Sequence, residues 1–247
     1  MNNDLMKQQL FAISLLDGRN RGKMEDVSRF FSEFALIKYR ILVEVKYLIF
    51  LSQNTKIVRK FSKKEVDFLQ EISEKFTPED AVTVKEFETT INHDVKAVEY
   101  FLKEKLSKTS LADIVSFIHL GLTSYDINIP AYALILKEFR DEVLLLKFTE
   151  ILRALKQLII KTKSMHMLGR THGQPALPTT MGKELAVYFQ RLKNEVGIYG
   201  KEPIEAKLTG AVGNLNALKF IAPDLDWLSL SKKFIQYLGL KTNIFTT

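Results

Sequence analysis

Histidine is the side chain through which this protein could best transfer protons, because imidazole titrates closest to neutral pH. The chain holds four histidines: His93, His119, His166 and His172. It holds no cysteine among its 247 residues, which excludes disulfides, thiolate zinc sites and cysteine nucleophiles. Acid–base chemistry in this chain therefore depends on the surroundings of these four residues.

His172 has the most polar and most constrained surroundings of the four. It lies in the segment Gly169–Pro175, where two glycines and a proline flank arginine, threonine and glutamine. The segment falls between two predicted helices, and a turn held by a rigid scaffold is where proteins commonly present functional groups. A surface turn with incidental polar residues is the alternative. The residue types favour a functional site.

A second polar segment, Thr89–Asp94, lies at the start of a predicted helix. Thr90 or Asn92 could cap that helix, and the free N–H groups of its first turn would attract a phosphate or carboxylate near His93. A plain cap with His93 as a solvated neighbour is the alternative. The residues alone favour neither.

A third segment, Leu122–Asn128, is a hydroxyl-rich start to a later helix. Thr123 and Ser124 could form a carboxylate-binding nest, or they could simply cap the helix, which is the simpler interpretation. The two remaining histidines suggest structural roles. His119 has apolar neighbours, which predicts a core histidine with its hydrogen bonds satisfied. For His166 a favourable dipole contact at a helix end is as good an explanation as catalysis.

Apolar periodicity predicts the helices that must position these segments. Residues 26–52 repeat apolar side chains every three or four positions, which is the helical period. Thr77 followed by Pro78 and two acids is a typical helix start. In the first half of the chain we expect helices at residues 26–52, 64–75, 78 onward, 93–106 and, briefly, 110–119.

The longest predicted helix covers residues 126–164. Neither glycine nor proline occurs between Pro130 and Gly169, and about 35 helical residues extend roughly 50 Å. Its apolar stripe is too wide for one neighbouring helix, so we expect a bundle, which subunits could share. Further helices are expected at residues 179–199 and 224–238, with a glycine loop, Thr209–Asn214, between them.

The fold class that follows is all-α. Glycine (11) and proline (6) are scarce, which disfavours a turn-rich β sandwich. The only strands we expect form a short hairpin near the N-terminus or near residues 201–210. We expect an N-terminal helical domain at residues 1–110 and the first part of a central helical-bundle domain at residues 111–247.

Composition and motif searches exclude several classes of function. No apolar run approaches the roughly 18 residues of a membrane span, and no cleavable signal peptide is evident, so we expect a cytoplasmic protein without a membrane. The net charge of +7 suits an anionic ligand, but the basic residues alternate with acids, so we expect no nucleic acid. No P-loop, H-E-x-x-H or nucleophile elbow occurs, and we expect no metal and no cofactor.

Polar segments separated along a long-helix scaffold resemble the fumarase/aspartase lyase superfamily and, within it, the bacterial-type adenylosuccinate lyase family. The run Asn92–Lys105 is specific to that family, whereas Thr123–Asn128 identifies only the superfamily. The resemblance implies the fumarase/aspartase long-helix bundle with a smaller N-terminal helical domain. It covers the chain almost end to end, through Leu16–Arg19, Thr89–Lys105, Thr123–Asn128, Gly169–Pro175 and Gly210–Asn214.

The resemblance implies β-elimination of fumarate from adenylosuccinate, giving AMP, and from the related succinylocarboxamide intermediate of purine synthesis. A base removes a proton from the carbon next to a succinyl carboxylate, and an acid protonates the departing nitrogen. By similarity His172 is the general acid, and Thr123 and Ser124 hold a succinyl carboxylate. The nucleotide and phosphate region is then lined by Arg19, Asn20, Asn92, His93 and Asp94. Imidazole, cationic and N–H groups suit such a polyanionic substrate.

The chain departs from the family pattern in three places. Asn20 stands where members often have tyrosine, and Tyr125 stands where they often have an acid. The serine-bearing loop G-S-S-x-M-P-x-K-x-N-P, which the resemblance implies as the source of the catalytic base, does not occur in the 247 residues. We expect this chain to be an inactive amino-terminal portion, since a missing base costs about 10²–10⁴ in rate.

Family members are homotetramers whose active sites combine several subunits, so the resemblance implies a homotetramer acting on a small anionic nucleotide. Two alternatives remain open. One is another fumarate-releasing lyase, such as an argininosuccinate lyase. The other is a non-catalytic helical module for oligomerisation or partner binding.

Overall fold

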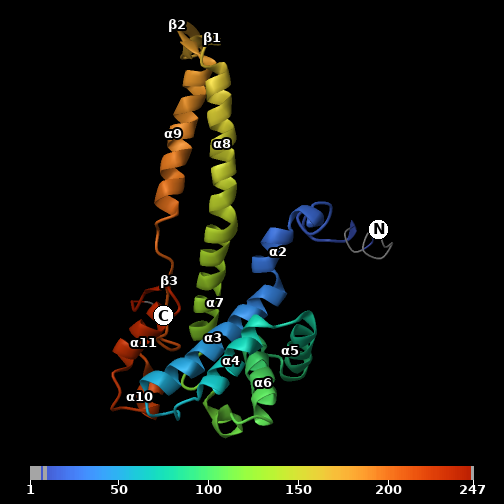
Figure 1. Ribbon diagram of the computed structural model, residues 1–247, viewed down its shortest axis with the longest axis vertical. Helices are drawn as coiled ribbons and strands as arrows, with labels where there is room; N and C mark the ends of the chain where they lie inside the picture. Colours follow the sequence, from blue (N-terminus) through green and yellow to red (C-terminus); the bar gives the residue numbers. More distant parts are fainter. Residues whose placement is uncertain (1–6, 8–9, 246–247) are drawn as a thin grey trace. The chain divides into compact units, whose positions relative to one another are not determined.

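The computed structural model describes Lys7 and residues 10–245, and these fall into two compact units (Figure 1). Unit 1 combines the chain up to Leu136 with the chain from Ile204 onward, and unit 2 is the segment Lys137–Pro203 between them. The predicted division into residues 1–110 and 111–247 stays a prediction.

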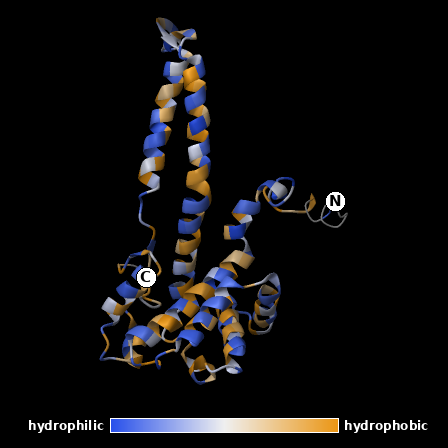
Figure 2. Ribbon diagram, viewed as in Figure 1, coloured by the Kyte–Doolittle hydropathy of each residue, from blue (hydrophilic) through white to orange (hydrophobic). Residues whose placement is uncertain are grey.

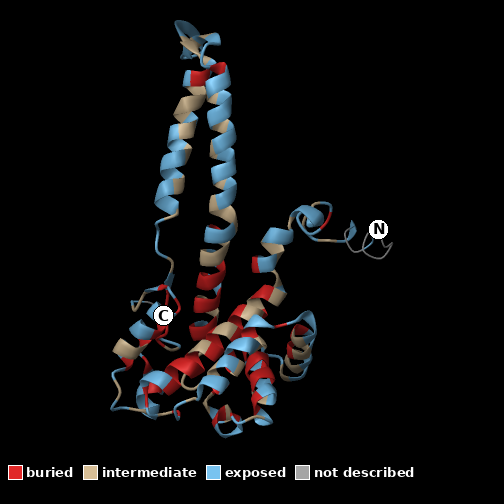
Figure 3. Cartoon of the chain, viewed as in Figure 1, coloured by how far each residue is buried: buried red, intermediate tan, exposed pale blue. Residues whose placement is uncertain are grey.

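Unit 1 is built around one long buried helix. After the short helix η1 (Arg21–Lys23) come α2 (Glu25–Phe31) and α3 (Glu33–Asn54). The predicted helix at 26–52 is therefore two helices, because Ser32 takes extended backbone and its hydroxyl accepts the N–H of Ala35 at 3.2 Å. Burial is concentrated in α3, which Figure 3 shows largely in red.

Three helices pack against α3 or against one another: α4 (Lys63–Glu74), α5 (Pro78–Ile91) and α6 (Asp94–Ser107). These confirm the predicted helices at 64–75, from Pro78, and at 93–106. The predicted Thr77 cap is confirmed too, because its hydroxyl accepts the Asp80 N–H and the Asp80 carboxylate accepts the Thr77 N–H. The short helix expected at 110–119 is a 3₁₀ helix, η2 (Ala112–Phe117).

The rest of unit 1 comes from both sides of unit 2 in the sequence. It holds α7 (Ser124–Phe139) up to Leu136, then α10 (Asn216–Ile221) and α11 (Trp227–Tyr237). The sequence analysis missed α10. The chain around residue 205 does form a strand, but β3 (Glu205–Ala206) pairs in parallel with β4 (Lys241–Thr242) rather than in a hairpin. Phe234 of α11 meets Tyr47 and Phe50 of α3 edge-on.

Unit 2 is a pair of antiparallel helices joined by a β-hairpin. It contains η3 (Arg140–Leu144), α8 (Leu145–Thr162), β1 (His166–Thr171), β2 (Gln174–Thr180) and α9 (Met181–Tyr199). The helix predicted at 126–164 is confirmed over residues 124–162, except that η3 is a π-helical turn. The helix predicted at 179–199 is confirmed as α9.

The hairpin corrects the sequence analysis, which expected strands only near the N-terminus or near 201–210. Residues 10–24 contain turns and η1 but no strand. Instead, β1 and β2 pair antiparallel through a two-residue loop, His172 (φ 52°) and Gly173 (φ 73°). Positive φ at both loop positions is the geometry that matches the twist of paired strands.

Unit 2 buries no apolar side chain of its own. In residues 137–203, all of which the structure describes, only Arg140, Thr162 and Gly182 are buried. Apolar positions run along α8 and α9 in Figure 2, yet Figure 3 shows these helices mostly exposed. In the part of the chain that the structure describes, no helix combines the length and apolar character needed to cross a bilayer.

Candidate functional site

Arg40 joins two of the polar segments singled out in the sequence. Its guanidinium is buried in α3, with Nη2 2.5 Å from Asp94 Oδ2 at the start of α6. Its Nε donates to Asn128 Oδ1 of α7 at 2.8 Å. Thr89–Asp94 and Leu122–Asn128 therefore lie beside each other in unit 1, although neither motif contains Arg40.

The ion pair with Arg40 also affects Asp94. Burial raises the pKa of this carboxyl, but the Val95 N–H and the Arg40 charge outweigh burial and hold its pKa below the usual range. Asp94 thus stays charged near neutral pH and brings a negative charge to the start of α6. Such a charge stabilises the helix but does not by itself attract a phosphate.

His93 is itself the cap of α6, which corrects the expectation that Thr90 or Asn92 would cap it. Its Nδ1 accepts the N–H of Lys96 at 3.1 Å. Asn92 instead ends α5 in the left-handed conformation, with φ 55°. A ring whose Nδ1 accepts a hydrogen bond carries its proton on Nε2, so His93 can offer an N–H donor to a ligand.

Thr123 and Ser124 lie where α7 begins. The N–H of Thr123 donates to Asp126 Oδ2 at 3.1 Å, so a side chain within the first turn satisfies the helix start. The hydroxyls of Thr123 and Ser124 have no hydrogen-bond partner within the described part of the chain. The two hydroxyls predicted to hold substrate are thus free to do so.

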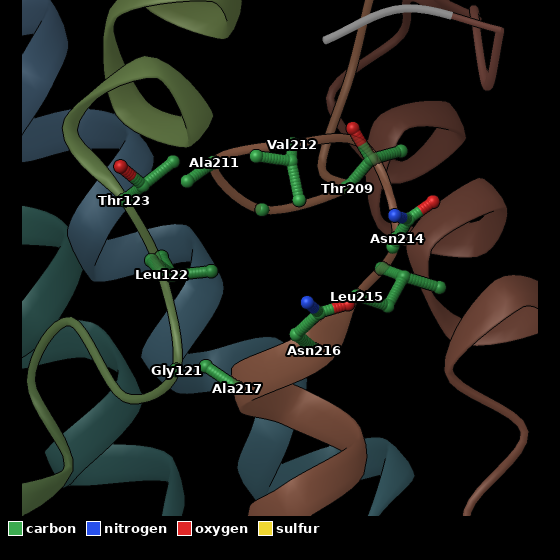
Figure 4. Close-up of a pocket in the computed structure, with 11 residues that line it drawn as sticks. Gly121, Leu122, Thr123, Thr209, Ala211, Val212, Asn214, Leu215, Asn216 and Ala217 are labelled. Carbon is green, nitrogen blue, oxygen red and sulfur yellow. The ribbon is translucent and has the colours of Figure 1, made fainter.

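A pocket of about 280 Å³ opens between this helix start and the glycine loop (Figure 4). Gly121–Thr123 form one wall, Thr209–Val212 a second and Asn214–Ala217 a third. Neither an acidic nor a basic side chain lines it. Thr209 lines the pocket with its hydroxyl buried and without a partner, which is uncommon in folded proteins unless a water or ligand completes it.

Close to this pocket in the sequence, His119 forms a buried ionic cluster. Its Nδ1 lies 2.5 Å from Glu44 Oε1 and 3.9 Å from Glu99 Oε1. Burial lowers the pKa of His119, but the Glu44 hydrogen bond and the charges of both glutamates outweigh burial and hold it above the ordinary value. Nδ1 of His119 thus has the hydrogen-bond partner that the sequence predicted, on a side chain that is mostly buried.

His172, the predicted general acid, lies in unit 2 at the tip of the β1–β2 hairpin and is exposed. His166 is also exposed and opens β1, so it lies in a strand rather than at a helix end. In unit 1 Arg19 is exposed and Asn20 half-buried just before η1, and neither lines the pocket. The predicted site residues that unit 1 brings together are thus those of the Thr89–Asp94 and Leu122–Asn128 segments.

Sequence reasoning missed Arg40, Glu44 and Lys207. All three are buried charged residues. Arg40 and Glu44 give one local signal, a charge on each side of the apolar run Ile41–Val43, whereas nothing beside Lys207 distinguishes it from an exposed lysine. No group of three metal-ligating side chains occurs in the described residues. The site offers hydroxyls, amides, an imidazole N–H and backbone N–H groups, which suit a polar, carboxylate-bearing organic ligand.

Comparison with known proteins finds one family and a consistent set of relatives. The family model described as "Lyase" matches residues 18–243. The adenylosuccinate lyase of Dictyostelium discoideum is 44% identical, over 99% of this chain and 54% of its own length. Those of Haemophilus influenzae and Escherichia coli strain K12 are 43% and 41% identical, each over 96% of this chain and 53% of their own length. The chain thus spans about half the length of these curated relatives.

Solved structures share the fold at lower identity. A fumarate lyase from Mesorhizobium sp. BNC1 matches with a TM-score of 0.71 and 19% identity, over 92% of this chain and 49% of its own. The beta-carboxy-cis,cis-muconate cycloisomerase of Acinetobacter calcoaceticus sp. ADP1 matches with a TM-score of 0.66 and 22% identity, over 90% of this chain and 50% of its own. These likenesses establish the helical fold.

Proposed function

Because this chain belongs to the lyase family, we propose that it supplies part of an adenylosuccinate lyase, an enzyme that eliminates fumarate from adenylosuccinate and from the related succinylocarboxamide ribonucleotide. The observation that carries the proposal is 41–44% identity to three curated adenylosuccinate lyases over at least 96% of this chain. The reaction serves purine nucleotide synthesis, and we place it in the cytoplasm.

In the proposed mechanism His172 protonates the nitrogen that leaves as the carbon–nitrogen bond breaks. Its place at the tip of a tight hairpin supports this role, because a two-residue loop fixes the backbone from which the His172 side chain projects. The base that removes the carbon-bound proton is supplied by the serine loop, which the 247 residues do not contain. This chain alone is therefore inactive.

The substrate's anionic groups are divided between two parts of unit 1. Thr123 and Ser124 hold a succinyl carboxylate, which their unpartnered hydroxyls support. His93 offers Nε2–H to the nucleotide side, together with Asn92 and Asp94. Arg19 and Asn20 complete that region, Arg19 contributing the positive charge that a phosphate requires.

Assembly into a homotetramer with shared active sites is part of the proposal. Its support is the composition of unit 2, which exposes apolar side chains on α8 and α9 and buries none. A second copy of the same helices would cover them.

The experiment is a split-enzyme assay. The 247-residue chain is co-expressed with the remaining carboxy-terminal segment of the Haemophilus influenzae relative, and the mixture is offered adenylosuccinate and, separately, argininosuccinate. We expect fumarate release from adenylosuccinate by the mixture, none by the chain alone, and at least about 10²-fold loss with His172→Asn. Cleavage of argininosuccinate only, or turnover that survives His172→Asn, would contradict the proposal.

A further inference from the structure

Asp126 is the most completely buried charged group near the pocket, and none of the roles proposed above uses its carboxylate. Its exposed fraction is 0%, and its oxygens accept three backbone N–H groups from two segments. Thr123 N–H lies 3.1 Å away, Thr209 N–H 3.0 Å and Gly210 N–H 3.1 Å. A single carboxylate therefore bonds two of the pocket's walls at once.

Lys207 completes this arrangement from the glycine-loop side. It is 1% exposed, and its Nζ lies 3.6 Å from Asp126 Oδ1. The same Nζ donates to the carbonyl of Gly210 at 2.7 Å. Gly210, whose φ is 81°, is thus held at its N–H by Asp126 and at its carbonyl by Lys207. Holding both polar groups of one residue fixes its peptide planes as well as its position.

Neither side chain can touch a ligand in the pocket. The lining comprises Thr123, Thr209 and Gly210, which the pair bonds through their backbones, but neither Asp126 nor Lys207. In Figure 4 the methyl group of Thr123 faces Ala211 across the gap between the two walls, and the Thr123 hydroxyl is turned away from the glycine loop. The pair therefore lies behind the walls, where it can set their separation.

We propose that Asp126 and Lys207 are positioning residues, a buried ion pair that holds the start of α7 at Thr123 and the glycine loop at the separation needed to bind one carboxylate in the pocket. The choice of a carboxylate as the ligand rests on the proposed function, whereas the positioning of the two walls by the ion pair does not. A buried charge pair is costly to assemble and is a weak source of net stability. Its value here is that charge-assisted bonds hold two chain segments 83 residues apart more rigidly than apolar packing would.

The test uses the full chain and three variants. Asp126→Asn keeps the shape of the side chain but removes its charge, Lys207→Met removes the other charge, and the double variant removes both. The control is Glu205→Gln, which alters an exposed ion pair with Lys241 two residues before Lys207. Circular dichroism and the fluorescence of the single tryptophan, Trp227, establish that each variant is folded.

The first readout is hydrogen exchange at single amides, which needs no ligand. We expect Asp126→Asn to speed exchange at the bonded amides of Thr123, Thr209 and Gly210 and to spread the increase to their neighbours in the walls, at residues 121–122 and 211–214. The double variant should exchange more slowly than either single variant, because no charge is then left unpaired. An increase confined to residues 123, 209 and 210, or one equal to that of Glu205→Gln, would overturn the positioning role.

The second readout is the affinity for succinate, measured by calorimetry on the folded variants. We expect each single substitution to weaken binding by about tenfold or more, because the two walls are then no longer held at the binding separation by their charge-assisted bonds. Glu205→Gln should stay within about twofold of the unaltered chain. Equal affinity in Asp126→Asn and the unaltered chain would overturn the proposal. If the unaltered chain binds no succinate, the carboxylate assignment fails, and the exchange pattern alone decides whether the pair positions the walls.

Discussion

The imidazole of His93 has two nitrogens with different surroundings. Nδ1 accepts the Lys96 N–H and so caps α6, while Nε2 carries the proton and remains available. The ring is half-exposed, with 51% of the side chain accessible to solvent. A substitution at this position therefore tests helix stability and ligand binding together, unless the replacement preserves the cap.

Asparagine separates the two roles of His93, because its side-chain oxygen is a good cap but cannot reproduce Nε2–H. We expect His93→Ala to lower the free energy of unfolding by about 1 kcal/mol and His93→Asn to leave it nearly unchanged. Both should weaken AMP binding to the chain by a similar factor. Urea unfolding and calorimetry give the two quantities. Normal AMP affinity in His93→Asn would mean that His93 serves only as a cap.

His119 offers a second test at a single residue, through the pH dependence of stability. Its pKa is raised because the hydrogen bond to Glu44 and the charges of Glu44 and Glu99 outweigh burial and the repulsion of Lys96. A raised folded-state pKa means that the stabilisation is fully present below the ordinary histidine value of about 6.5 and is lost as pH rises through the folded-state value.

We therefore expect the free energy of unfolding to fall as the pH rises above about 6.5 and through the raised folded-state pKa of His119. The fall should be smaller in Glu44→Gln, where the partner charge is gone, and unchanged in His166→Asn, which alters an exposed histidine in β1. Urea denaturation at a series of pH values measures the free energy of unfolding of each variant. The same slope in Glu44→Gln and the unaltered chain would show that this pair does not set the pH dependence.

Among the secondary-structure elements, the β1–β2 hairpin depends on its loop. His172 has φ 52°, a conformation that asparagine adopts readily and β-branched residues do not. Substitutions of His172 can therefore distinguish an effect on the backbone of the hairpin from an effect on the proposed proton transfer.

We expect His172→Val to destabilise the hairpin by about 1 kcal/mol or more, because valine is strained at positive φ. His172→Asn should leave the exchange of the strand amides unchanged. Hydrogen exchange of residues 166–180 measures both. If His172→Asn also loosens the strands, then its loss of turnover in the split-enzyme assay cannot be assigned to the missing imidazole.

The contact between α8 and α9 depends on Gly182, at the start of α9. A Cβ at Gly182 would lie 2.7 Å from the Ile159 carbonyl and 2.7 Å from Lys163 Cα, so the two helices are too close there for any side chain. Gly197, in the same helix, has nothing within 4 Å of a built Cβ.

These two glycines form a matched pair. Gly182→Ala should destabilise unit 2 by about 1–3 kcal/mol, because backbone atoms must move apart. Gly197→Ala should stabilise it by up to about 1 kcal/mol, because alanine favours the helix. Thermal unfolding followed by circular dichroism compares the two. A stabilising Gly182→Ala would mean that α8 and α9 are not held at this close approach.

For the chain as a whole, the contrast in burial between the units bears on the proposed assembly. Unit 1 contains many fully buried apolar residues, whereas unit 2 buries none. Helices with apolar faces in water are stabilised chiefly by covering those faces. In the proposed homotetramer, other copies of this chain cover the apolar side chains of the α8–α9 pair.

We expect the chain to self-associate through α8. The double substitution Ile151→Glu with Leu158→Glu, at two exposed apolar positions one heptad apart, should shift the chain to a smaller species in analytical ultracentrifugation. Gln157→Glu, a comparable change at an exposed polar position of the same helix, should leave the association unchanged. A chain that is monomeric at every concentration would contradict the proposed homotetramer.

The sequence by itself determined the three polar segments and most of the helices, although not α10 or the break at Ser32. Thr77 and Pro78 marked a helix start, and the apolar repeat predicted helical backbone from residue 124 to 162, because both signals are local and depend on neighbours within about one turn. The glycines flanking His172 marked a turn for the same reason. They did not reveal the strands beside it, whose alternation is interrupted by a bulge between Leu168 and Arg170.

Only the tertiary structure decided what joins these segments. Arg40 bonds Asn128 across 88 residues, and Asp126 bonds Thr209 across 83. Side-chain periodicity depends on residues that are close together along the chain. It therefore cannot predict which distant backbone N–H group will donate to a buried carboxylate. The sequence therefore determines which residues could do chemistry, and long-range packing determines which segments of unit 1 lie beside one another.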